Sequence, residues 1–196
     1  MTKGRLEAFS DGVLAIIITI MVLELRVPHD PELSALSPVL PVLASYVLSF
    51  VNVGIYWNNH HHLLHTTEHV NGAVMWANLH LLFWLSLVPF GTAWMGENHF
   101  AAVPTAAYSV VLLMSAIAFT ILQRKIIQLQ GAHALLASAV GGDLKGKVSL
   151  AAYASAIPLA FVNHWISSAL YVAVAVMWFV PDPRISRALA AEPRHT

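Results

Sequence analysis

Residues 6–25 read LEAFSDGVLAIIITIMVLEL, an almost unbroken apolar run near the start of the chain. A helix needs about 20 mostly apolar residues to cross the hydrocarbon core of a bilayer. The interruptions Glu7, Ser10, Asp11 and Glu24 all lie toward its two ends. No small-residue cleavage site follows the run before Glu24, so we predict a retained first transmembrane helix rather than a signal peptide.

The composition of the whole chain supports the same class. Of its 196 residues, 58% are apolar and 10% are charged, whereas soluble domains have roughly 45–50% apolar and about 25% charged residues. Basic and acidic residues number ten each, which argues against a nucleic-acid partner. The absence of cysteine excludes disulfides, thiol catalysis and thiolate metal sites. We therefore predict an all-α integral membrane protein in a lipid bilayer.

Five further apolar windows follow the first. The predicted spans are residues 6–25, 39–59, 73–95, 101–122, 148–162 and 165–180. The last two are separated by Asn163-His164, which we expect to form a tight turn. Residues 131–147 are Gly/Ala-rich, carry no phosphate-binding pattern and are predicted to be a linker. Together these features predict one six-helix transmembrane domain over residues 1–196.

The distribution of basic residues predicts the orientation of the chain. Six spans place both termini on the same side of the membrane. Of the ten basic residues, all except Arg26 fall on that side: Lys3, Arg5, Arg124, Lys125, Lys145, Lys147, Arg184, Arg187 and Arg194. Cytoplasmic loops carry the excess of Lys and Arg. We therefore expect a multi-pass protein of the cell membrane with cytoplasmic N- and C-termini.

One stripe of the first span is apolar apart from a single hydroxyl. At about 100° per residue it contains Phe9, Gly12, Ile16, Thr19, Ile20 and Leu23. Asp11 lies about 140° around the helix from Ile16. A carboxylate within a span usually faces protein and a partner. If the Asp11 face meets protein, the Ile16 face is left to meet either lipid or a central axis.

Asp11 is expected at the same depth in the membrane as the end of the second span and the start of the third. These segments supply Asn58, Asn59, His60, His61, His62, Trp76, Asn78 and His80. We expect Trp76, Asn78 and His80 to contact Asp11 and its neighbour Ser10. Such a polar network would lock three helices together, and a proton relay is the alternative role.

The histidines of residues 60–65 also raise the question of a metal. His61 and His65 have the i, i+4 spacing that places two ligands on one helix face. The H-E-x-x-H pattern is absent, and no acidic third ligand is close in sequence. We therefore predict no metal site and no cofactor, and no catalytic motif such as G-x-S-x-G indicates an enzyme.

Three stretches together resemble a known family. Arg5, Phe9, Ser10 and Asp11 spell R-x-x-x-F-S-D at the start of the first span. This motif, the run from Tyr56 to His62 and Trp76-Ala77-Asn78-Leu79-His80 resemble prokaryotic members of the transmembrane protein 175 family of potassium channels. The resemblance covers essentially the whole chain. It implies one six-helix repeat per chain, assembly as a homotetramer and a pore lined by the first helix.

The resemblance also implies roles for single residues. Ile16 would form a hydrophobic constriction, Thr19 would contribute to potassium preference, and Leu23 would form a second apolar layer, with Ile20 on the same stripe. Potassium ions would be the permeant partner. A proton-conducting or weakly selective cation channel is the alternative function. A small membrane enzyme or scaffold whose stripe merely packs is the alternative from another class.

Overall fold

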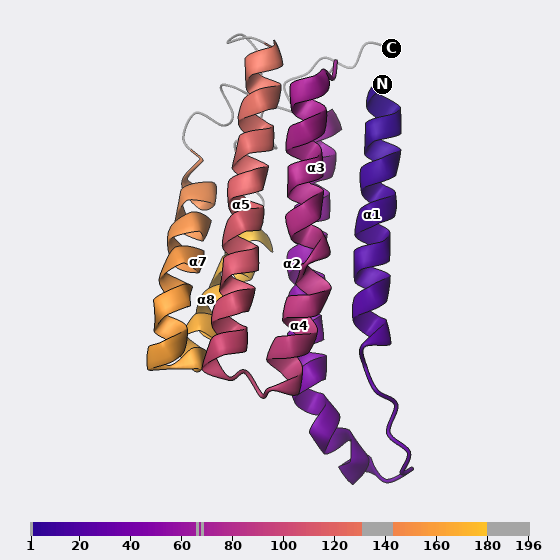
Figure 1. Ribbon diagram of the computed structural model, residues 1–196, viewed down its shortest axis with the longest axis vertical. Helices are drawn as coiled ribbons and strands as arrows, with labels where there is room; N and C mark the ends of the chain where they lie inside the picture. The colour runs from indigo at the N-terminus through magenta and orange to yellow at the C-terminus, as the bar shows by residue number, and fades with distance from the viewer. Residues whose placement is uncertain (1, 66, 68, 131–142, 180–196) are drawn as a thin grey trace.

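The computed structural model describes residues 2–65, 67, 69–130 and 143–179, and these residues are helical apart from short connections (Figure 1). The elements are α1 (Lys3–Leu23), the 3-10 helix η1 (Leu33–Val39), α2 (Leu40–His65), α3 (Gly72–Ser86), α4 (Val88–Glu97), α5 (Ala102–Gln130), α7 (Leu144–Val162) and α8 (His164–Phe179). The prediction of an all-helical protein is confirmed.

Four stretches are long and apolar enough to cross a membrane. They are Lys3–Leu23, Leu33–His65, Gly72–Glu97 and Ala102–Gln130, while His164–Phe179 is a shorter apolar helix. The chain is therefore a multi-pass membrane protein. The basic residues of the tail, Arg184, Arg187 and Arg194, lie outside the described residues.

The third predicted span, residues 73–95, is divided into two helices. The break falls at Leu87, whose φ of −87° and ψ of −9° remain close to helical values. Pro89 lies in the first turn of α4. Because proline has no backbone N–H, it cannot donate to the preceding turn, and the helical hydrogen-bond ladder is interrupted there. The two helices still follow one another in a single rod (Figure 1).

The connection predicted at residues 131–147 is shorter than expected. α5 runs on to Gln130, well beyond residue 122, and α7 begins at Leu144. Lys145 and Lys147 are therefore helical. Asp143 caps α7, because its Oδ1 accepts a hydrogen bond of 2.8 Å from the backbone N–H of Gly146, which satisfies one of the unpaired donors at a helix start. Residues 131–142 lie outside the described residues.

Successive rods run up and down the bundle. α1 lies at one edge and α7 with α8 at the other (Figure 1). α1 packs against α2, α3 and α4, and α5 packs against both α3 and α7. The predicted turn between α7 and α8 is confirmed: Asn163 is extended, and its Oδ1 accepts a hydrogen bond of 3.0 Å from the N–H of Trp165.

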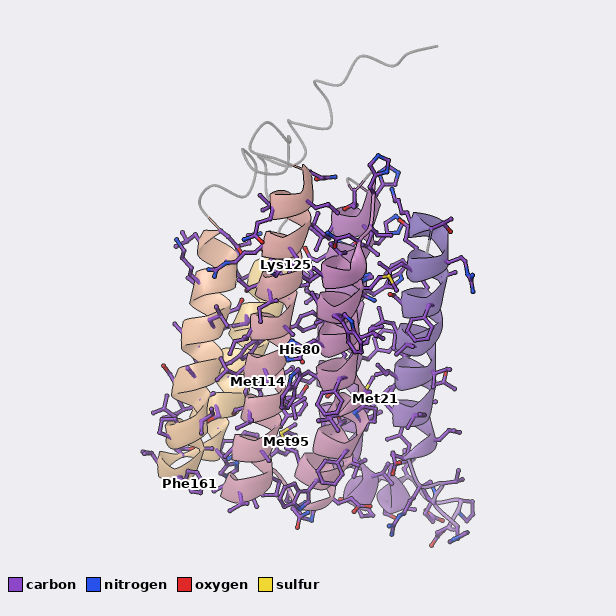
Figure 2. The ribbon with its side chains drawn as sticks, turned by 45° about the horizontal axis from the view of Figure 1, so that its top comes forward. Met21, His80, Met95, Met114, Lys125 and Phe161 are labelled. Atoms are coloured by element: carbon purple, nitrogen blue, oxygen red, sulfur yellow. The ribbon has the colours of Figure 1, made fainter. Side chains whose placement is uncertain are left out.

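One face of α1 is buried against the bundle. Its residues are Leu6, Ser10, Leu14, Ile17 and Met21. Figure 2 shows Met21 on the side of α1 that is turned toward the other helices. These positions follow the 3.6-residue period of an amphipathic helix, so the packing of α1 settles which side remains outside.

The interior of the bundle is also polar. The buried side chains Ser49, Thr92 and Tyr108 join three helices, since Thr92 donates to Ser49 at 2.6 Å and the hydroxyls of Ser49 and Tyr108 are 2.8 Å apart. Hydrogen bonds between helices stabilise membrane bundles because unpaired polar groups are costly in hydrocarbon. α2, α4 and α5 are thereby held in one register.

Candidate functional site

The predicted stripe of α1 lies on its exposed side. Ile16 is 60% exposed and Leu23 is 76% exposed, and Phe9, Gly12, Thr19 and Ile20 are exposed as well. The opposite face is the buried one. The stripe therefore points away from the bundle formed by its own chain, as a surface that meets either lipid or another subunit.

Asp11 does not have the partner that we predicted. Its Oδ1 accepts a hydrogen bond of 3.0 Å from the indole Nε1 of Trp57 on α2. The Trp57 ring in turn stacks on His61, with ring centroids 6.1 Å apart. Neighbouring residues on a helix point about 100° apart, so Ser10 turns toward α3 while Asp11 turns toward α2.

Ser10, Asn78 and His60 form a buried hydrogen-bonded chain. Asn78 Nδ2 donates to Ser10 Oγ at 2.9 Å, and Asn78 Oδ1 lies 2.6 Å from His60 Nε2. Because the amide nitrogen of Asn78 is turned to Ser10, its oxygen must accept, and His60 carries its proton on Nε2. All three side chains are at most 2% exposed. These hydrogen bonds join α1, α3 and α2.

His80 and Trp76 make no hydrogen bond with Asp11 or Ser10, so neither is the partner that we predicted. His80 Nε2 accepts a hydrogen bond of 3.0 Å from Trp84 Nε1, one turn further along α3. Trp76 is 75% exposed, because it precedes the buried Asn78 by two residues and points about 200° away from it. Arg5 is exposed and makes no hydrogen bond or ion pair with another described residue.

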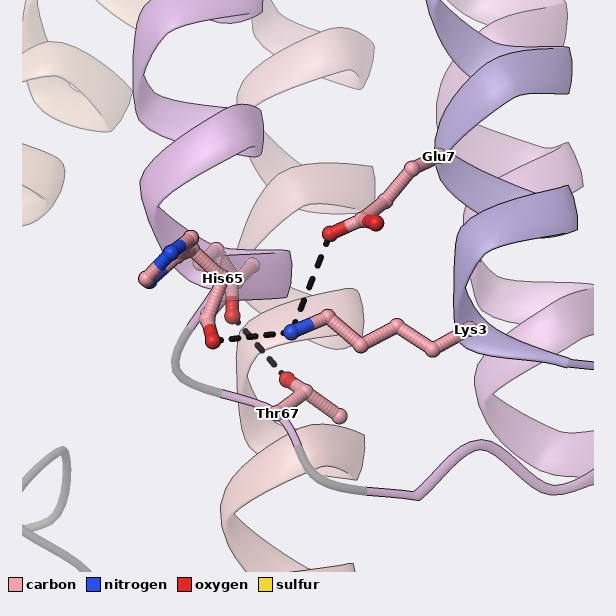
Figure 3. A network of polar contacts seen from close by, with 5 residues as sticks. Lys3, Glu7, His65 and Thr67 are labelled. Atoms are coloured by element: carbon pink, nitrogen blue, oxygen red, sulfur yellow. Dashed lines mark hydrogen bonds and ion pairs between the residues drawn. The ribbon is translucent and has the colours of Figure 1, made fainter.

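A second anchor of α1 was not predicted from the sequence. Lys3 Nζ donates a hydrogen bond of 2.9 Å to the carbonyl of His65 and lies 3.9 Å from Glu7 (Figure 3). A cation at the last carbonyl of α2 also complements the negative end of the helix dipole. The i, i+4 spacing of Lys3 and Glu7 could have predicted their ion pair, but nothing in the sequence indicates the hydrogen bond from Lys3 to His65. α1 is thus tied to α2 both at its start and at Asp11.

The histidine pair does not form a complete metal site. The rings of His61 and His65 are 6.1 Å apart. Within the part of the chain that the structure describes, no group of three or more His, Cys, Asp or Glu residues is placed to hold a metal ion.

Removing the central amide of the buried chain should destabilise the bundle. We expect Asn78→Leu to lower the free energy of unfolding by about 1–2 kcal/mol, because His60 loses its buried acceptor. The midpoint of thermal unfolding in detergent measures the effect. Trp76→Leu, on the exposed side of the same helix, is the control and should leave the midpoint nearly unchanged. Equal midpoints for the two variants would contradict the network.

These features define a multi-pass membrane bundle that holds its first helix by polar anchors and presents that helix's apolar face outward. A family model described as "Endosomal/lysosomal potassium channel TMEM175" matches residues 5–89, which begin at the arginine of the R-x-x-x-F-S-D motif and include most of α1 and all of α2 and α3. The chain belongs to the TMEM175 family, which is a family of ion channels and not of enzymes.

Three similar proteins represent this family. A protein of Chryseobacterium sp. (strain P1-3), named a potassium channel, is 53% identical over 96% of this chain and 98% of its own length. The crystal structure of a lysosomal potassium-selective channel TMEM175 homolog from Chamaesiphon minutus has 28% identity and a TM-score of 0.77, covering 95% of this chain and 97% of its own. The endosomal/lysosomal proton channel TMEM175 of Danio rerio is 40% identical over 35% of this chain and 16% of its length.

Proposed function

We propose that this protein is a potassium channel in which α1 from each of four identical subunits lines a central pore. The observation that carries the proposal is the exposed α1 face with Ile16, Thr19, Ile20 and Leu23. One helix cannot enclose a path, but copies of one face around a symmetry axis can. The naming of the Chryseobacterium relative and the description of the Chamaesiphon homologue as potassium-selective support potassium as the permeant ion.

Ile16 forms the constriction in this proposal. Its side chain offers no oxygen to replace the hydration shell of an ion, so a ring of four isoleucines closes the path by dewetting. When the ring widens, each ion still loses hydration free energy in passing. Potassium gives up water more readily than sodium, so the ring favours potassium, though less strongly than a filter lined by carbonyl groups.

Thr19 supplies an oxygen one turn beyond Ile16. Its hydroxyl donates to the carbonyl of Ala15 at 2.8 Å, so the proton is engaged within the helix and the oxygen lone pairs remain for a passing ion. This oxygen offsets part of the dehydration cost. Leu23 then forms the second apolar layer, near the end of α1.

The orientation in this proposal places both termini in the cytoplasm and the end of α1 at the outer face of the cell membrane. That face carries Glu24, Asp30 and Glu32, while the side chain of Glu97 is paired with Arg26 at 3.1 Å. The excess of carboxylates raises the local concentration of cations at the pore mouth.

Flux from liposomes tests the function. Purified protein in vesicles loaded with potassium should release potassium faster than it releases sodium under matched gradients. The second candidate is a proton channel, which the naming of the Danio rerio relative favours. Proton flux in the absence of potassium flux would overturn the first candidate in favour of the second, and no flux of either ion would overturn both.

Single cysteines test the assembly. The chain has no native cysteine, so Ile16→Cys or Leu23→Cys introduces one thiol per subunit. We expect oxidation to link subunits into dimers at either position, because four α1 helices meet at the axis. Phe161→Cys, on an exposed position at the opposite edge of the bundle, is the control. Labelling of residue 16 by a lipid-phase reagent without crosslinking would contradict the pore assignment.

A further inference from the structure

The protein contains a cavity that α1 does not line. It lies among α2, α5, α7 and α8, near the start of α7, and has an accessible volume of about 40 Å³. At ~10–15 Å³ of such volume per water, it has room for about three waters. Its polar wall includes Asn52, Asn59, Thr120, Asp143 and Ser149. No residue of α1 lines it, so the cavity is separate from the proposed pore.

Most hydrogen-bond donors on this wall are already engaged. Thr120 and Ser149 donate to carbonyls one turn earlier, at 2.9 Å and 2.8 Å. One amide hydrogen of Asn59 is bonded in the same way to Ile55, at 2.8 Å. The indole of Trp178 donates to Ser149 at 3.0 Å. The groups that remain available to a ligand are therefore mainly oxygen lone pairs, and these can bind only a hydrogen-bond donor or a cation.

Asp143 is the one charged residue among the described residues that line the cavity. One of its carboxylate oxygens accepts from the N–H of Gly146 at 2.8 Å. The other makes no hydrogen bond or ion pair with a described residue. The cavity therefore combines a negative charge with neutral acceptors, and this pattern fits a cation that carries several N–H donors.

Aromatic rings supply most of the rest of the wall. They are Tyr56, Phe119, Tyr153 and Trp178. The faces of such rings attract cations. The ring of Trp178 already does so within the chain, since the ammonium of Lys145 lies 5.7 Å from its centroid. An ammonium group would therefore meet ring faces as well as oxygen acceptors here.

We propose that this cavity binds a primary ammonium group. Such a group has three donors and no acceptor, which matches the acceptors left by Asn59, Thr120 and Asp143. The small volume suits an ammonium with a short carbon chain. A soluble amine and the ethanolamine headgroup of a lipid share this chemistry.

Binding of 3-fluoropropylammonium to the purified full chain in detergent, followed by ¹⁹F NMR, tests the proposal. The neutral isostere 3-fluoropropanol is the matched ligand. We expect saturable binding of the ammonium and at least about tenfold weaker binding of the alcohol, which corresponds to about 1.4 kcal/mol. No binding, or equal binding of the two ligands, would overturn the proposal.

Variants then locate the site. Asp143→Asn keeps the cap of α7 but removes the charge, and we expect about tenfold weaker ammonium binding. Phe119→Leu should weaken ammonium binding several-fold and leave the alcohol unaffected. Asp30→Asn, which removes an exposed carboxylate elsewhere, is the charge-matched control. Unchanged affinity in both Asp143→Asn and Phe119→Leu, or loss of binding in Ile16→Asn, would place the ligand elsewhere and overturn the proposal.

A titration in lipid distinguishes a lipid headgroup from a soluble amine as the natural ligand. The same titration is repeated in lipid discs of phosphatidylcholine, with and without phosphatidylethanolamine. Competition by phosphatidylethanolamine would identify a lipid headgroup as the occupant. Unchanged affinity in both discs supports a soluble amine. Loss of binding in both kinds of disc would overturn the proposal, because lipid itself would then fill or close the cavity.

Discussion

Ile16→Asn is expected to raise ion flux roughly tenfold and to reduce the preference for potassium over sodium. A tenfold change in rate corresponds to about 1.4 kcal/mol in the barrier, and wetting an apolar ring removes a desolvation cost of at least this size. β-Branching leaves Ile16 few rotamers, so the proposed ring of Ile16 side chains would be stiff as well as apolar. The amide side chain admits water and so stabilises sodium and potassium alike.

Reversal potentials and conductance in the same bilayer measure both effects. Thr19→Val is the matched variant on the same face, because it removes one oxygen at nearly constant shape. It should weaken the potassium preference without raising conductance, since the proposed ring of Ile16 side chains is left intact. Wild-type conductance and selectivity in Ile16→Asn would show that the constriction lies elsewhere.

Gly96→Ala is expected to destabilise the bundle strongly. A Cβ at Gly96 would lie 2.8 Å from the backbone Cα of Val42 and closer still to Ser45 Oγ. α4 and α2 meet at this point, so a backbone would have to shift. Overpacking of this kind costs about 1–3 kcal/mol of stability. Because the clash at Gly96 involves backbone, we expect the loss for Gly96→Ala to lie at the upper end of this range or beyond it.

Gly54→Ala is the control for Gly96→Ala. Gly54 lies within α2, and a Cβ there would meet nothing within 4 Å. Replacing it should leave stability unchanged or raise it by up to about 1 kcal/mol, because alanine favours the helix. Thermal unfolding of both variants in one detergent compares them. Equal midpoints would show that α2 and α4 do not approach closely at Gly96.

The helical rods and the face of α1 could be predicted from local sequence. Each apolar window is a property of consecutive residues, and the angle of a side chain around its own helix follows from a fixed rotation per residue. For this reason the stripe through Phe9, Ile16 and Leu23 was expected on one face, and that face is exposed. The break at Leu87 lies just before Pro89. The proline is visible in the sequence, but we did not predict that it would divide the span of residues 73–95.

The partners of those side chains depended on the tertiary structure. A residue's angle on α1 is local, but the residue that it meets depends on the height and rotation of the neighbouring helix, which no local pattern contains. Trp57, which was not among the expected partners, therefore faces Asp11, and His80, which was, does not. The cavity near Asp143 and the close approach at Gly96 likewise arise only where separate helices come together, because each is made by side chains or backbones that are far apart in the sequence.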